Sequence, residues 1–204
     1  MIAAESIREF RTADIAALFV LACLQSLFTY PFEEVFREYF FLWSILVWVF
    51  LVAFGAQLTK RAGSAVILSV MSSILTWGVD DLGVHGWRRL IIFVLSALVF
   101  EIVFIILKVD YKNVSFDVIA ASALAGASIP LMMILVMSPQ VGLNMGYDSV
   151  NLSLASLFAG IVGATLSFLL WFELRAEPFV IRYQYLHTRL HHSYFARRWW
   201  NFIR

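Results

Sequence analysis

The sequence predicts an all-α integral membrane protein in which six transmembrane helices form one bundle. The chain of 204 residues is 62% hydrophobic and 14% charged, and its mean hydropathy is +0.85, which is too apolar for a soluble core with a wetted surface. Six apolar stretches are long enough to cross a hydrocarbon core of about 30 Å as helices. They cover residues 15–32, 39–58, 62–79, 90–107, 118–137 and 152–172. Because unpaired backbone groups are costly in lipid, we expect these spans to pack as a compact bundle.

Lysine and arginine residues predict the orientation of the bundle. Of the fifteen, only Arg37, Arg88 and Arg89 fall on connections opposite to the N-terminus. Cytoplasmic connections are enriched in basic residues, so the N-terminus and the C-terminus are both expected inside. We therefore expect a multi-pass protein of the plasma membrane. The net charge of +1 gives no basic face for nucleic acid, so no nucleic-acid partner is expected.

Two segments divide the chain. Residues 1–177 are expected to hold the six helices, and residues 178–204 to form a basic, aromatic cytoplasmic tail. Apolar side chains recur at helical spacing in this tail, with basic residues between them: Phe179, Tyr183, Leu186, Leu190 and Tyr194. This pattern predicts an amphipathic helix that lies on the inner leaflet of the membrane.

The outer connection "WGVDDLGVHGWRR", residues 77–89, carries the candidate ligand-binding residues. It combines aromatic rings with polar groups, the usual chemistry of a small-molecule site: Trp77, Asp80, Asp81, His85 and Trp87. The last outer connection offers a second polar group in Asn144, Tyr147 and Asn151. Two alternatives stay open, because tryptophans can anchor a protein at the membrane interface and the two aspartates can pair with Arg88 and Arg89 at the surface. One histidine beside two adjacent acids is a poor ligand set, so no metal site is expected.

Glu101 is the one charged residue inside an expected span. An ionisable group within a membrane span is a functional candidate, because its burial is expensive unless it is paired or hydrated. Glu101 lies about 20 Å along the helix from Arg88, which places it in the inner half of the membrane. This depth favours a hydrogen bond to another helix, or contact with a partner, over contact with an external ligand.

Small residues spaced four apart mark faces on which helices can approach closely in lipid. Three such pairs are Ala13/Ala17, Ala121/Ala125 and Gly160/Ala164. Packing within the bundle is the favoured interpretation. The alternative is that the first helix docks a separate membrane partner through Ala13, Ala16 and Ala17.

Three stretches of the sequence, taken in order, together resemble a known family of proteins. They read "KRAGSAVILSVMSSILTWGVDD", "LIIFVLSALVFEIVFIILK" and "LASLFAGIVGATLSFLLWFEL". The first contains Arg61, Ala62 and Gly63, the second holds Glu101 three residues before a phenylalanine, and the third contains Gly160. In this order they resemble the substrate-binding S component of energy-coupling factor (ECF) transporters, in particular the branch associated with thiamine precursors and related vitamins.

The resemblance implies a subunit that captures a small vitamin-like heterocycle from outside. It would hand this ligand inward in complex with a transmembrane coupling subunit and a pair of ATP-hydrolysing subunits. The sequence has no Gly-x-x-x-x-Gly-Lys-Ser/Thr motif, so ATP would be bound by other chains, and no cofactor is expected in this one. A stand-alone ligand sensor, or an assembly protein without transport, stays the alternative. An enzyme is not expected, because no span carries a catalytic constellation of the usual spacing.

The orientation can be tested by labelling single cysteines, introduced at Ser149 or at Ser193 in a chain that lacks Cys23. An impermeant thiol reagent added to intact cells should label the first position and miss the second, because only the first is expected outside. Equal labelling at both positions would contradict this orientation.

Overall fold

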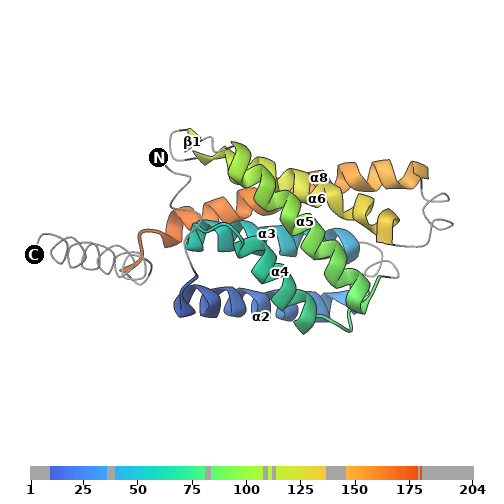
Figure 1. Cartoon of the computed structure of the whole chain (residues 1–204), viewed down its shortest axis with the longest axis horizontal. Helices are drawn as coiled ribbons and strands as arrows, with labels where there is room; N and C mark the ends of the chain where they lie inside the picture. The colour runs from blue at the N-terminus through green and yellow to red at the C-terminus, as the bar shows by residue number, and fades with distance from the viewer. Residues whose placement is uncertain are drawn as a thin grey trace, which may run out of the picture. The chain divides into compact units, whose positions relative to one another are not determined.

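The computed structural model describes most of the chain as helix. The described residues are 10–35, 40–80, 84–107, 110–111, 114–136, 146–178 and 180. Within them, six helices follow in order: α2 (Thr12–Val35), α3 (Phe40–Thr59), α4 (Ser64–Leu75), α5 (Gly86–Leu107), α6 (Phe116–Val136) and α8 (Gly146–Leu174). Two short antiparallel strands, β1 (Asp110–Tyr111) and β2 (Val114–Ser115), join α5 to α6. Figure 1 shows the helices along the chain.

Five of these helices, α2, α3, α5, α6 and α8, are long and apolar enough to cross a membrane. Their positions agree with five of the six stretches expected from the sequence. The most apolar window lies in α5, with a mean hydropathy of 3.1. A helical membrane protein is therefore confirmed at the level of composition and helix length, whereas the side of the membrane that each end faces stays a prediction.

The remaining stretch, residues 62–79, does not form a full-length span. Its helix, α4, has only 12 residues, about 18 Å at the helical rise, against a hydrocarbon core of about 30 Å. It begins after Gly63, which has a left-handed φ of 92°, and residues 76–78 form a turn after it. Within the described residues, the six expected stretches therefore correspond to five helices of spanning length and one shorter apolar helix, α4. Hydropathy alone does not mark the residues at which such a helix begins and ends.

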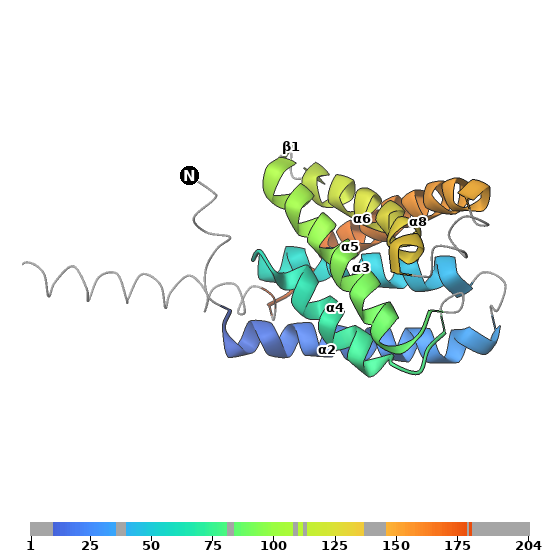
Figure 2. The ribbon, with the colours of Figure 1, turned by 45° about the vertical axis from the view of Figure 1, so that its right-hand side comes forward.

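The chain divides into two compact units, Met1–Phe168 and Leu169–Arg204. In the first unit, α4 contacts α2, α3 and α5, and Figure 2 shows α4 among these three helices. The core of this unit is apolar and includes Leu18, Ile45, Trp48, Leu68 and Phe100, all of which are fully buried. The Nε1 of Trp48 donates a hydrogen bond to Ser69 Oγ at 3.0 Å, which ties α3 to α4.

Glycines allow the close crossing of α6 and α8. A Cβ atom on Gly126 would lie 2.6 Å from the carbonyl oxygen of Ser156, and one on Gly160 would lie 2.6 Å from that of Ser122. Ala121, Ala125 and Ala164 are fully buried. The packing interpretation is thus confirmed for the small residues of α6 and α8.

The small residues of α2 behave differently. Ala13 and Ala16 are exposed, and Ala17 is half-buried. This face of α2 is therefore open on the surface of the described structure.

The C-terminal tail lies largely outside the described residues, which include only residues 178 and 180 of it. The amphipathic helix expected there stays a prediction.

Candidate functional site

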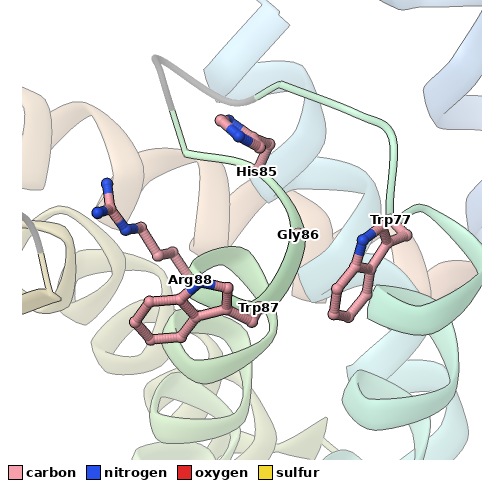
Figure 3. Close-up of a pocket in the computed structure, with 5 residues that line it drawn as sticks. All are labelled: Trp77, His85, Gly86, Trp87 and Arg88. Atoms are coloured by element: carbon pink, nitrogen blue, oxygen red, sulfur yellow. The ribbon is translucent and has the colours of Figure 1, made fainter.

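A hollow with a volume of about 420 Å³ lies between the end of α4 and the start of α5. Its lining residues are Trp77, His85, Gly86, Trp87 and Arg88. Figure 3 shows Trp77 on the turn that follows α4 and Trp87 in the first turn of α5, on either side of Gly86. The two indole side chains are about half exposed, at 50% and 56%. The structure thus brings together three of the residues predicted for the site, Trp77, His85 and Trp87.

Gly86 joins the two ends of the connection between α4 and α5 through a hydrogen bond. Its backbone N–H donates a hydrogen bond to the carbonyl oxygen of Trp77 at 3.2 Å. Its φ of 60° lies in the left-handed region that favours glycine, and a Cβ atom there would lie 3.4 Å from the indole ring of Trp77. The glycine therefore sets how closely Trp77 approaches the start of α5.

Arg89 follows the lining residue Arg88 in the first turn of α5 and is buried, with 1% of its surface exposed. Its Nη1 donates hydrogen bonds to the Thr76 carbonyl oxygen, at 3.4 Å, and to Thr76 Oγ1, while Nη2 donates to Ser44 Oγ at 3.4 Å. The guanidinium also lies over the ring of Phe93, 4.8 Å from its centroid. A cation at this point suits the C-terminal end of α4, where carbonyl groups carry partial negative charge. The alternative in which the two aspartates pair with Arg88 and Arg89 at the surface does not fit the burial of Arg89.

Glu101 occupies the opposite end of α4. Its Oε1 accepts a hydrogen bond from the backbone N–H of Ala65 at 2.8 Å, and the residue is buried. First-turn N–H groups have no acceptor inside their own helix, and a carboxylate there also complements the helix dipole. Of the interpretations open for Glu101, the structure therefore shows the hydrogen bond to another helix.

Arg89 and Glu101 both belong to α5 and together form what we call the α4 bracket. They lie about 18 Å apart along α5 at the helical rise, which matches the length of the 12-residue α4. One long helix thus supplies a charged side chain to each end of the short helix. The bracket fixes the position of the C-terminal end of α4 and therefore the backbone position from which the Trp77 side chain extends.

A buried ion pair joins the beginning of α2 to the connection between α3 and α4. Arg61 Nε lies 3.0 Å from Asp14 Oδ2, and both side chains are buried. The same Asp14 oxygen accepts the backbone N–H of Arg11 at 3.1 Å. Sequence reasoning did not predict this pair. The available signal was an acid at the start of an apolar run and a base in a short connection, both expected on the same side of the membrane.

Two other predicted site residues with described side chains, Asp80 and Asn151, do not line the hollow. Asp80 is exposed, does not line the hollow, and its backbone N–H donates to Glu33 Oε1 at 3.3 Å. Asn151 is exposed on α8 and is not a lining residue either. Tyr147 belongs to the first turn of α8, whereas Asp81 and Asn144 lie outside the described residues.

No protein-family model, curated protein or solved structure matches this chain. Among the described residues, no group of three or more His, Cys, Asp or Glu side chains is placed to hold a metal ion. What the hollow can do chemically therefore follows from its lining: two flat aromatic faces, an imidazole and a guanidinium.

Removal of the Glu101 carboxylate should destabilise the fold. Glu101→Ala leaves the Ala65 N–H without an acceptor and should lower the free energy of unfolding by about 1.5–3 kcal/mol, the range for a hydrogen bond to a charged group. Glu101→Gln keeps an acceptor oxygen and should lose less. Equilibrium unfolding in detergent measures both variants, with Glu173→Ala, an exposed position on α8, as the control. A Glu101→Ala protein as stable as the control variant would contradict the capping role.

Proposed function

We propose that the chain is a membrane-embedded substrate-capture protein that binds a small heterocyclic, vitamin-like molecule in the hollow between α4 and α5. The observation that carries the proposal is the placement of Trp77 and Trp87 around one cavity of about 420 Å³. Small-molecule sites have volumes of roughly 300–1,000 Å³ and combine apolar walls with a few polar groups. Flat indole rings suit a flat heterocycle, because aromatic rings stack with their faces offset.

The backbone contact between Trp77 and Gly86 supports binding over simple anchoring at the interface. An interfacial tryptophan needs only a place near the lipid headgroups. Here the backbones that carry the two indoles are joined through the Gly86 N–H and the Trp77 carbonyl oxygen. The end of α4 before them is also held by buried Arg89. A fixed backbone reduces the entropy lost when a ligand orders the site.

Within this proposal the protein acts as the S component of an ECF-type importer in the plasma membrane, as the sequence resemblance implies. The exposed small-residue face of α2, with Ala13 and Ala16, supports contact with a transmembrane coupling subunit, because small side chains let helices approach closely in lipid. ATP would be hydrolysed by separate subunits. Co-purification of such chains with the protein separates this role from that of a stand-alone sensor.

The two tryptophans test the proposal directly. Trp77→Ala and Trp87→Ala should each weaken the binding of a flat heterocycle by about 1–3 kcal/mol, by analogy with the stacking of bases on aromatic side chains. Affinity is measured for nicotinate, nicotinamide and a thiamine pyrimidine precursor, and the melting temperature is measured on the same purified variants. Trp43→Ala, which removes a tryptophan that does not line the hollow, is the control.

Binding and stability should change separately if the hollow is the site. Loss of affinity at an unchanged melting temperature supports a binding role for the two indoles. Wild-type affinity in both variants, with a lower melting temperature, would make them interface anchors and would refute the proposed site.

A further inference from the structure

We infer that the hollow takes a planar aromatic ligand that carries an anionic group, such as a carboxylate or a phosphate. This inference rests on the proposed function and narrows its ligand class. It comes from the polar groups on the lining, which are the indoles of Trp77 and Trp87, the imidazole of His85 and the guanidinium of Arg88.

Hydrogen-bond donors dominate these side chains. An indole N–H and a guanidinium can only donate, and an imidazole can donate from one nitrogen or from both. No carboxylate lines the hollow among the described residues. Asp80, a candidate ligand-binding residue from the sequence, is not a lining residue. A complementary ligand therefore supplies acceptors, and an anionic ligand supplies the strongest ones.

Arg88 provides the charge that selects such a ligand. Its guanidinium lies over the Trp87 ring, 5.7 Å from the centroid, and its side chain is exposed. It makes no salt bridge within the described part of the chain, in contrast to Arg61 with Asp14. The N–H edges of an exposed guanidinium are available to a ligand, and these edges match a carboxylate or phosphate in a two-point contact.

The local backbone adds to the same preference. Arg88 lies in the first turn of α5, and this turn contains no acidic residue. The amides at the start of a helix carry partial positive charge, which favours an anion close to them. Arg88 is also one of only three basic residues on connections expected outside, where basic residues are disfavoured. A ligand-binding role accounts for an exposed arginine in that position.

A charge series on one ring tests the inference without any substitution. Benzoate, benzamide and benzamidine have similar shapes and carry a negative, a neutral and a positive group. Equilibrium dialysis against the full-length protein in phosphatidylcholine nanodiscs should give benzoate an affinity about tenfold higher than that of benzamide, the effect of one charge-assisted hydrogen bond. Benzamidine should bind more weakly than either.

Two arginine variants identify the source of this selectivity. Arg88→Gln should remove most of the preference for benzoate, so that benzoate and benzamide bind with similar affinities. Arg175→Gln is the matched control, because Arg175 also packs over an aromatic ring, that of Phe172 at 4.1 Å, and does not line the hollow. A preference for benzoate that survives in Arg88→Gln would overturn the inference.

Other outcomes separate this inference from the proposed function. If benzamide or benzamidine binds as tightly as benzoate, and Trp87→Ala weakens all three, the charge selectivity is overturned and the proposed function stands. If none of the three binds in a manner that depends on Trp77 or Trp87, both are overturned. An anionic lipid headgroup offers the same chemistry, so the dialysis is repeated with phosphatidylglycerol in the nanodiscs. Loss of benzoate binding under that condition would assign the hollow to lipid and overturn a free ligand.

Discussion

The structure depends on the way α5 holds both ends of the short helix α4. A 12-residue helix that ends inside an apolar bundle leaves its terminal N–H and C=O groups without intrahelical partners, and lipid offers them no water. Glu101 accepts one of these N–H groups at Ala65, and Arg89 donates to the Thr76 carbonyl oxygen just after the last turn. The signs of both charges match the helix dipole. The α4 bracket therefore supplies a charged partner at each end of α4, and the hollow begins just beyond the Thr76 end.

The buried charges and the exposed charges of this molecule have separate roles. Burial of an ion is expensive unless hydrogen bonds or an opposite charge compensate it. The buried charged residues have such contacts: Asp14 and Arg61 form an ion pair, and Arg89 and Glu101 form hydrogen bonds with backbone groups. These groups set the positions of α2, α4 and α5. Arg88, adjacent to Arg89 in sequence, is exposed on the hollow. One arginine of the pair therefore shapes the site, and the other is available to a ligand.

Hydropathy could predict the long helices because a membrane span requires a continuous apolar run. It could not predict the length of α4, since the left-handed Gly63 and the hydrogen bonds of Arg89 depend on backbone conformation and on contacts distant in sequence. The aromatic and histidine residues of the hollow were predictable from composition, because they cluster in one connection. Arg88 and Arg89 have the same side chain, so only their positions around the axis of α5 distinguish the exposed arginine from the buried one. Arg89 shares its face of α5 with Phe93, Ser96 and Phe100, which are all buried, and that periodicity was the available signal for its burial.

Amide hydrogen exchange at Ala65 tests the α4 bracket most directly. The amide lies in the first turn of α4, where an N–H group has no intrahelical acceptor and ordinarily exchanges quickly. We expect the Ala65 amide to exchange slowly in the wild-type protein and much faster in Glu101→Ala, while the amides at the other end of α4 change little. We expect the reverse pattern in Arg89→Met, with faster exchange at Thr76 and slow exchange at Ala65. Equal exchange of the Ala65 amide in the wild-type protein and in Glu101→Ala would contradict the role of Glu101 at the start of α4.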